Sequence, residues 1–352
     1  MAKYEYIARL LENRIRHGDY LLKEVPSERE LALEAQVSHM TARKAILHLV
    51  DKGLLVRRPN RRLAVRRDRG NARKQVQIAL LSSPYPNPYL ELWHLWLNEM
   101  ARERECFVRV IGYCHWDDAV ILDTIEGFDG TFLLPLSDQI PLSLIRRIKQ
   151  AGRPVVILGQ DTSEHGIPSL RITSPSMVQK LLDHLGGLGH RHVDCLNTQP
   201  PDQVIRARID QWQLWLAAHG GTGTLFDEPV RVYHSPIRGA CETVRRLLDA
   251  GELKPNAALF CVTTSAALGA LRAIYEKGLK AGKDISVCSA EDGADVAPYL
   301  TPALTCLRDR DPKPYLGVCV DWILRGGENW VGPLAVQPAD AMVFEGETTG
   351  RR

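Results

Sequence analysis

The residues best suited to chemistry in this sequence lie near its N-terminus and are Ser38, His39, Met40, Thr41, Arg43 and Lys44. Hydroxyl, imidazole and cationic side chains of this kind donate hydrogen bonds to phosphate oxygens and to the edges of bases. Between and after them, Ala42, Ala45, Ile46 and Leu49 recur at helical spacing. We therefore expect one helix with a buried apolar face and a polar N-terminal end that can contact nucleic acid.

A second short helix comes just before this one and must position it. Ser27 is the expected N-cap of this short helix. Glu30, three residues later, would complete a capping box, and such a cap contributes about 1 kcal/mol. Val37 ends the turn, Ser38 caps the next helix, and Gly53 stops it. Two helices joined by so tight a turn predict a helix-turn-helix, in which the N-terminal end of the second helix enters the major groove of DNA.

Two further elements complete the expected N-terminal domain. Residues 4–16 predict a helix whose apolar face, with Ile7, Leu11 and Ile15, packs on the other two helices. Residues 56–67 predict a small hairpin around Pro59 and Asn60. The tip of this hairpin carries Arg57, Arg58, Arg61 and Arg62. The pattern is typical of a winged helix, with the wing arginines placed to reach phosphate.

The charge of the chain is divided between its two ends. Residues 1–75 contain 18 Lys and Arg against nine Asp and Glu, a net charge of +9, while the remainder carries −6. Neutralising phosphates releases counterions, so the basic part suits a polyanion and the acidic remainder would repel it. Residues 67–75 are charged and nearly free of apolar side chains, which predicts a basic linker.

Several short motifs of the N-terminal domain resemble the gluconate-repressor (GntR) family of winged-helix regulators. The run YIA from Tyr6, the run PSERELA from Pro26, and Leu49 followed by Gly53, Leu54 and Leu55 have the order and spacing of that family. The resemblance implies that Arg29 grips a backbone phosphate, that Ser38, His39 and Met40 lie against the groove, and that Thr41 and Arg43 contact phosphate or base edges. His39 and Asn60 depart from the family, which often has an arginine and a glycine at these places.

Each of these residues also has a structural alternative. Arg29 could pair with Glu30 or Asp51, Thr41 could be an ordinary surface residue of the helix, and the wing arginines could simply be solvated.

The rest of the chain, residues 76–350, alternates apolar runs with helical patterns, and this alternation occurs twice. The expected strands are VQIALL, CFVRVIG, GTFLLPL and PVVILG, followed by HVDCLN, VRVYH, AALFCV and ISVCSA. Such a pattern predicts an α/β fold with two doubly wound lobes, each a parallel sheet covered by helices on both faces. The strand ends of the two lobes should then meet across one cleft, where ligands bind such sheets.

This second part resembles the effector-binding domain of the lactose/galactose-repressor (LacI/GalR) family, which is itself similar to periplasmic sugar-binding proteins. The matching segments include FDGTFLLP, GRPVVILG and LGGLGHRHV, and Arg208 stands four residues before Trp212. A GntR-type winged helix joined to such a domain is similar to the arabinose-repressor architecture. That architecture implies that a sugar releases the protein from its operator.

The same resemblance implies a set of effector-binding residues. Arg208 would hold sugar hydroxyls by bidentate hydrogen bonds. Thr263 and Thr264 stand where the family has an Asn-Asp pair, and Glu291 stands where an Asp is usual. Tyr85, Tyr89, Trp116 and Trp212 could stack on a sugar face, or could belong to the cores of the lobes. The sequence thus indicates a small polar ligand, for which a pentose or a hexose is one candidate.

Other kinds of chemistry are not indicated. The sequence has no P-loop, no GxSxG and no HExxH, so we expect neither an enzyme nor a cofactor. The eight cysteines form no CxxC and are expected to be reduced core thiols rather than zinc ligands or disulfides. His190, Arg191 and His192 resemble a metal or catalytic cluster, but we expect them to belong to a structural turn before a strand. No signal peptide or membrane-spanning run is recognised, which predicts a cytoplasmic protein.

The sequence therefore predicts a DNA-binding transcriptional regulator, a repressor that binds double-stranded operator DNA as a homodimer, because one winged helix reads only a half-site. Its expected parts are a winged helix at 1–66, the linker at 67–75 and a two-lobed effector domain at 76–350. Two alternatives stay open: a ligand-independent regulator whose cleft has degenerated, and a cytoplasmic sugar-binding protein or enzyme with an incidental basic head.

Overall fold

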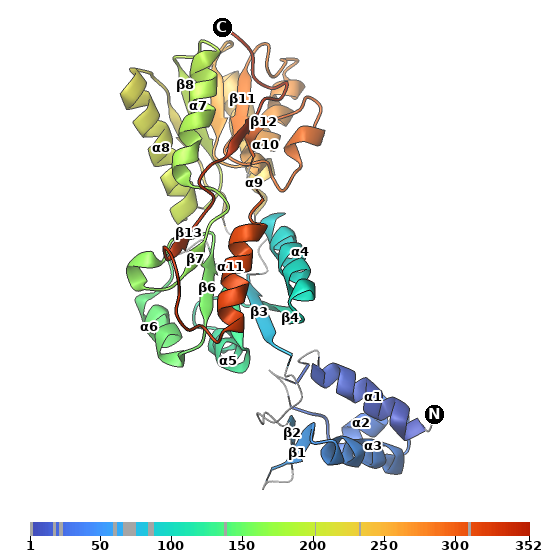
Figure 1. Ribbon diagram of the computed structural model, residues 1–352. Helices are drawn as coiled ribbons and strands as arrows, with labels where there is room; N and C mark the ends of the chain where they lie inside the picture. The colour runs from blue at the N-terminus through green and yellow to red at the C-terminus, as the bar shows by residue number, and fades with distance from the viewer. Residues whose placement is uncertain are drawn as a thin grey trace.

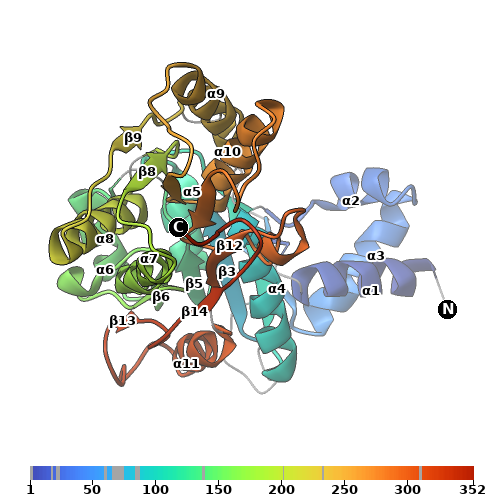
Figure 2. The same ribbon diagram turned by 90° about the horizontal axis from the view of Figure 1, so that it is seen from above.

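The computed structural model describes most of the chain and consists of a small N-terminal head and two larger lobes (Figure 1). The described residues are 3–16, 19–20, 24–58, 62–65, 75–83, 88–136, 139–200, 202–231, 234–308 and 311–352. Seen from above, the head again stands to one side of the lobes (Figure 2).

The head contains three helices and a two-stranded antiparallel sheet: α1 (Lys3–Arg16), α2 (Glu28–Glu34), α3 (His39–Asp51), β1 (Leu55–Arg57) and β2 (Leu63–Val65). The predicted capping box is present, because the Ser27 side chain accepts from the Glu30 N–H at 3.3 Å and the Glu30 carboxylate accepts from the Ser27 N–H at 2.7 Å. Gly53 ends α3 with φ of 72°. Leu11, Leu31 and Ile46 form the core of the head.

The first lobe is built on a six-stranded parallel sheet with the order β13-β7-β6-β5-β3-β4. Its strands are β3 (Gln77–Ser82), β4 (Phe107–Gly112), β5 (Gly130–Leu133), β6 (Val155–Leu158), β7 (Ser169–Leu170) and β13 (Ala335–Val336). Helices α4 (Pro88–Glu103) and α11 (Lys313–Leu324) cover one face. Helices α5 (Ala119–Gly127) and α6 (Leu142–Ala151) cover the other.

The second lobe has a sheet of the order β14-β12-β11-β10-β8-β9, parallel except for β14. Its strands are β8 (Val193–Asn197), β9 (Leu225–Asp227), β10 (Ala258–Cys261), β11 (Ser286–Ser289), β12 (Thr305–Arg308) and β14 (Met342–Phe344). Helices α7 (Val178–Gly187) and α8 (Gln203–His219) cover one face, and α9 (Pro236–Asp249) and α10 (Thr264–Glu276) the other. Short 3-10 helices are η1 (Ser163–His165), η2 (Pro175–Met177) and η3 (Ala297–Tyr299).

The predicted α/β class and the two doubly wound lobes are confirmed, with one strand placed wrongly. The segment VRVYH was expected to be a strand, but Val230 and Arg231 have no regular structure, and residues 232–233 lie outside the described part. The strand at this place is β9, which pairs with β8 and buries Phe226 in the lobe. The chain also passes between the lobes more than once, because α11 and β13 return to the first lobe and β14 to the second.

An ion pair connects the head with the first lobe. Arg109 of the edge strand β4 donates to the Asp19 carboxylate at 2.7 Å, and Arg14 of α1 donates to the other carboxylate oxygen at 3.4 Å. Burial would raise the pKa of Asp19, but the hydrogen bonds from Arg109 and Arg14 outweigh it and lower that pKa. The head is thus held to the lobe by a charge-assisted contact as well as by the chain.

Three absences hold for the described residues. No helix among them is both long and apolar enough to cross a membrane. No group of His, Cys, Asp and Glu there could hold a metal ion. All eight cysteines are free, and only Cys114 is exposed.

Candidate functional site

The N-terminal end of α3 presents a polar, cationic surface to solvent. Ser38, His39, Arg43 and Lys44 are exposed, Met40 is 64% exposed, and Thr41 is half-buried. The residues between and after them, Ala42, Ala45, Ile46 and Leu49, are fully buried. The helical period therefore separates a face that packs on α1 and α2 from a face that is available for a ligand.

Local hydrogen bonds fix this end of the helix. The Ser38 side chain accepts from the Thr41 N–H at 3.2 Å, and the two hydroxyl oxygens lie 2.8 Å apart. Nearby, the Glu28 carboxylate contacts His39 at 3.5 Å and Arg57 of β1 at 2.6 Å. Glu28 thus ties α2 to the start of α3 and to the wing.

The arginines of α2 and α3 have no counter-charge within the described part of the chain. The side chains of Arg29 and Arg43 are exposed and form no ion pair or hydrogen bond there, although Arg29 could have paired with Glu30 or Asp51. The Lys44 ammonium lies 5.6 Å from the centre of the Tyr4 ring. Unpaired guanidinium groups on a folded surface are free to bind phosphate, for which their fork geometry is suited.

The wing is only partly described. Arg58 is exposed and its N–H donates to the carbonyl of Arg62 across the hairpin at 2.9 Å. The side chain of Arg62 forms an ion pair with Glu24. Arg61 and Asn60 lie outside the described residues. Of the four wing arginines, Arg58 and Arg62 are thus exposed at the edge of the head, and Arg57 pairs with Glu28.

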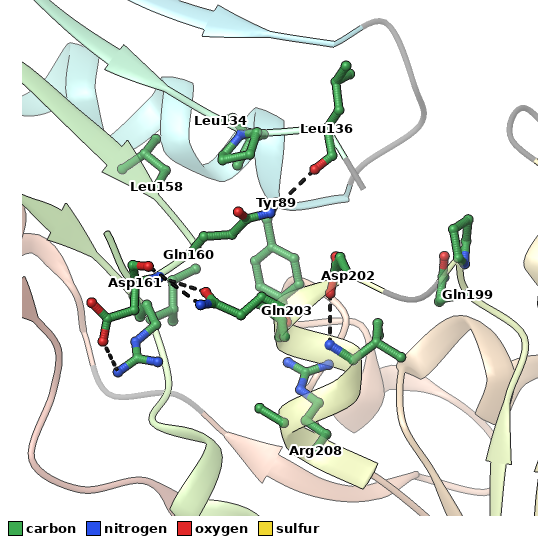
Figure 3. A pocket seen from close by; sticks show the side chains of 18 of the residues that line it. Tyr89, Leu134, Leu136, Leu158, Gln160, Asp161, Gln199, Asp202, Gln203 and Arg208 are labelled. Carbon is green, nitrogen blue, oxygen red and sulfur yellow. Dashed lines mark hydrogen bonds and ion pairs between the residues drawn. The ribbon is translucent and has the colours of Figure 1, made fainter. Parts of the chain in front are cut away.

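A second candidate site is a cavity of about 760 Å³ between the two lobes. Its lining includes side chains from both lobes and is drawn in Figure 3. Pockets for small molecules have volumes of about 300 to 1,000 Å³, so the cavity has room for a ligand of sugar size. Of the predicted effector-binding residues, Tyr89, Arg208, Thr263 and Glu291 line it.

Arg208 and Glu291 form the charged centre of the second lobe's side of the cavity. The Arg208 guanidinium lies 2.8 Å from the Glu291 carboxylate and donates to the Val262 carbonyl at 2.8 Å. The side chains are 11% and 13% exposed. The pair is therefore mostly desolvated. Because the guanidinium is held by two partners, the orientation of its other N–H groups is fixed.

The two threonines that follow β10 have different positions. Thr263 lines the cavity, and its hydroxyl oxygen caps α10 by accepting from the Ala266 N–H at 3.3 Å. Thr264 is not among the lining residues: it is buried, its hydroxyl donates to the Glu291 carbonyl at 2.7 Å, and its N–H donates to the Glu291 carboxylate at 3.3 Å. Thr264 therefore positions Glu291 rather than facing a ligand.

The aromatic residues divide in the same way. Tyr89 and Trp116 line the cavity, as does Trp93, which the sequence did not single out. Trp212 belongs to the core of the second lobe, where it is 3% exposed and donates to the Val193 carbonyl at 2.9 Å. Tyr85 lies outside the described residues.

Several polar residues of the cavity were missed from the sequence. Arg171 lies 3.4 Å from Asp161 at the edge of the first lobe. Gln203, at the start of α8 in the second lobe, accepts from the Asp161 N–H at 2.9 Å and donates to the Asp161 carbonyl at 3.5 Å, as Figure 3 shows. This amide therefore bridges the two lobes across the cavity.

Two carboxyl groups of the cavity have shifted pKa values. Burial raises the pKa of Asp202, against its backbone hydrogen bonds and the charge of Arg208. Burial would also raise the pKa of Asp161, but hydrogen bonds from Ser163 and the charge of Arg171 outweigh it and lower that pKa. Asp202 could have been predicted from the sequence as a residue of the cleft. An Asp that follows a strand and precedes a helical pattern is a typical N-cap, and such caps lie at the edge of the sheet where ligands bind.

Two family models match parts of this chain. Residues 3–65 match bacterial regulatory proteins of the gntR family, and residues 182–309 match the periplasmic binding protein-like domain. The chain therefore carries a gntR-type helix-turn-helix domain followed by a periplasmic-binding-protein-like domain.

Its curated relatives are transcriptional repressors. The probable HTH-type transcriptional repressor ExuR of Bacillus subtilis (strain 168) is 25% identical over 199 residues, which are 54% of this chain and 56% of that protein. The lactose operon repressor of Escherichia coli (strain K12) is 28% identical over 179 residues, which are 50% of this chain and 46% of that protein. The chain spans about half the length of these relatives.

Solved structures share the two-lobed fold. A LacI family transcriptional regulator from Enterococcus faecium with bound ribose has a TM-score of 0.64 at 19% identity, covering 78% of this chain and 99% of that one. The lac repressor dimer bound to operator and the anti-inducer ONPF has a TM-score of 0.64 at 19% identity, covering 79% of this chain and 95% of that one.

Proposed function

We propose that this chain is a DNA-binding transcriptional regulator, a repressor that acts as a homodimer and whose operator affinity is controlled by a small polar ligand in the interlobe cavity. The observation that carries the proposal is the exposed N-terminal end of α3, where Arg43 stands without a counter-charge in the gntR-type head. Expected partners are double-stranded operator DNA, the ligand and a second copy of the chain. The proposed parts are residues 1–66, 67–75 and 76–350.

The proposed role of α3 follows from its exposed face. With its N-terminal end in the major groove, Ser38, His39 and Met40 lie against the base edges, and Thr41 and Arg43 contact bases or phosphate. Arg29 of α2, Lys44 and the wing arginines Arg58, Arg61 and Arg62 would then contact the phosphate backbone. One head reads a half-site, so a dimer is required to read a full operator.

The proposed ligand is polar and sugar-like. The relative of known structure that holds ribose has the same two-lobed fold. In this chain Arg208 and Glu291 offer hydrogen bonds from one lobe, and Tyr89 and Trp116 offer aromatic faces from the other. A ligand that binds the closed form more tightly than the open form would shift the lobes, and with them the spacing of the two heads.

A DNA titration tests this proposal. The full chain is mixed with labelled duplex DNA at several salt concentrations, and binding is followed by fluorescence anisotropy. For each phosphate contact removed, the slope of log affinity against log salt should fall by about 0.9. Arg43→Ala should therefore weaken binding and, where Arg43 contacts phosphate, flatten that slope.

Lys52→Ala is the matched control, because Lys52 is an exposed cation at the far end of α3 that pairs with Glu12 at 3.2 Å. It should change the affinity little. Equal effects of Arg43→Ala and Lys52→Ala would contradict the assigned orientation of α3, and an absence of duplex binding would contradict the whole proposal.

One observation favours a ligand-independent regulator as a second candidate. The cavity is already spanned by Gln203, and Arg208 already has a carboxylate and a carbonyl as partners. Such contacts could replace a ligand. A panel of pentoses and hexoses separates the candidates: a ligand-controlled regulator shows a thermal shift with one of them, whereas a ligand-independent one shows none with any sugar and keeps the same affinity for DNA.

A further inference from the structure

The interlobe cavity contains more acidic than basic side chains. Among the described residues that line it, Asp161, Glu164, Asp202 and Glu291 are acidic, and Arg171 and Arg208 are basic. With histidine neutral, the lining has two more negative than positive formal charges. A cleft with low-dielectric walls concentrates the field of such an excess.

Both arginines of the cavity are already matched with carboxylates. Arg171 lies 3.4 Å from Asp161, and Arg208 lies 2.8 Å from Glu291, whose carboxylate also accepts from the Thr264 N–H. An anionic group on a ligand would have to compete with these carboxylates for either guanidinium. Each cation is thus offset by a carboxylate, although the Nε of Arg171 has no hydrogen-bond partner among the described residues.

Asp202 accounts for much of the excess. Its carboxylate caps α8 by accepting from the Ile205 N–H at 2.8 Å, and in the described part of the chain it forms no ion pair. Figure 3 shows Asp202 at the start of α8, among the residues that line the cavity. Glu164, in contrast, is 73% exposed and lies 3.4 Å from His165, so solvent screens it. Asp202 is thus an acidic group of the cavity lining that forms no salt bridge of its own in the described part of the chain, although the charge of Arg208 acts on it.

Aromatic side chains add to the same preference. Tyr89 and Trp116 line the cavity, whereas Trp93, which also lines it, is 1% exposed and belongs to the core of the first lobe. The faces of such rings attract cations and repel anions because of their quadrupole. The charges and the rings therefore favour the same sign of ligand charge.

Resting on the proposed ligand control, we infer that the cavity selects its ligand by charge: it takes an uncharged or amine-bearing polyhydroxy compound, with the amine beside Asp202, and rejects the carboxylate of the same skeleton. Because like charges repel each other strongly in a desolvated site, the acid should bind at least about tenfold more weakly than the neutral compound.

The field in the cavity can be measured without knowing the ligand. Cys114 lines the cavity and is the only exposed cysteine among the residues that the structure describes. Its rate of modification is compared for two methanethiosulfonate reagents of similar size, one carrying trimethylammonium and one carrying sulfonate. Each rate is divided by that of a small free thiol, and Cys241, which is partly exposed, is replaced by serine throughout.

The cationic reagent should react at least about threefold faster than the anionic one after this correction, as expected for a negative potential within a Debye length. Asp202→Asn should bring the ratio toward one, and because Asn is also a good N-cap, α8 should stay intact. Asp210→Asn, on the same helix but outside the cavity lining, is the matched control and should leave the ratio high. A ratio below one in the parent chain, or a ratio unaffected by Asp202→Asn, would overturn the inference.

A ligand series provides the second arm: glucose, glucosamine and glucuronate, and the corresponding galactose compounds, titrated calorimetrically. The inference is supported if the neutral or amino compound binds and the acid of the same skeleton binds much more weakly. In Asp202→Asn, this preference for the neutral or amino compound should shrink. An acid that binds as tightly as its neutral parent overturns the inference but leaves ligand control standing. If nothing in the series binds while the thiol ratio favours the cation, ligand control by sugars fails and the charge selectivity of the cavity stands.

Discussion

Replacing Arg208 by methionine should destabilise the second lobe, because it leaves the Glu291 carboxylate mostly buried without its counter-charge. The two side chains are 11% and 13% exposed and lie 2.8 Å apart. Methionine keeps much of the apolar stem of arginine, so the change removes charge and hydrogen bonds with little change in volume. The N–H of Thr264 still donates to Glu291 after the substitution, but no cation remains beside it among the lining residues of that lobe.

Removal of one partner of a buried ion pair costs about 3 to 5 kcal/mol, and the residual exposure of this pair reduces our expectation to about 2 to 3 kcal/mol. In a domain of this size such a loss lowers Tm by about 5 °C. Glu291→Gln should also destabilise. The double variant should lose less than the sum of the two single losses by about 1 kcal/mol or more, because neither charge is then left alone.

Scanning calorimetry of the four proteins tests this prediction. Arg246→Met is the matched control, since Arg246 pairs with Glu228 on the surface of the same lobe, where the side chains are 51% and 43% exposed. An exposed pair contributes about 0 to 1 kcal/mol, so its removal should change Tm by about 2 °C at most. The reasoning is refuted if Arg208→Met changes Tm no more than Arg246→Met, or if the two cavity substitutions are additive.

Three further predictions concern the head and the first lobe. Ser38→Ala removes the cap of α3 and should lower the stability of the head by about 1 kcal/mol, measured by chemical denaturation, while Ser38→Asp should retain most of it. Gly130→Ala should cost about 1 to 3 kcal/mol, because the new Cβ would stand 2.3 Å from Cγ2 of Ile323, and Ile323→Ala should rescue part of that loss. Asp19 has a lowered pKa, so the stability it adds is present above its unfolded pKa and is lost as pH falls through the lower folded value. The stability difference between parent and Asp19→Asn should therefore shrink below about pH 4, and a difference that stays constant with pH would argue against the contact with Arg109.

Much of the head could be predicted from the sequence because its signals are local. The capping box at Ser27 and Glu30, the cap at Ser38 and the glycine stop at Gly53 all act within a few residues, and all are present. The alternation of apolar runs and helices likewise gave the class of the two lobes. Both kinds of pattern depend on interactions between neighbours in the sequence.

The rest depends on contacts between distant segments. The bridge from Gln203 to Asp161 joins residues 42 positions apart, and nothing near either residue indicates the other. The strand β9 was missed because the segment Leu225–Asp227 has only three residues, fewer than the competing run VRVYH. Thr264 was assigned to the ligand because it stands where the resembled family has the Asp of an Asn-Asp pair, whereas its buried hydroxyl donates to the Glu291 carbonyl.

The central claim is that the exposed end of α3 reads the sequence of DNA as part of a dimer. The most direct measurement is selection of duplexes from a random library by the full chain, followed by sequencing of the bound fraction. We predict enrichment of an inverted repeat whose half-sites are about one helical turn apart or a multiple of it, and loss of this enrichment in Arg43→Ala. A library that stays random, or an enriched sequence that Arg43→Ala selects equally well, would contradict the claim.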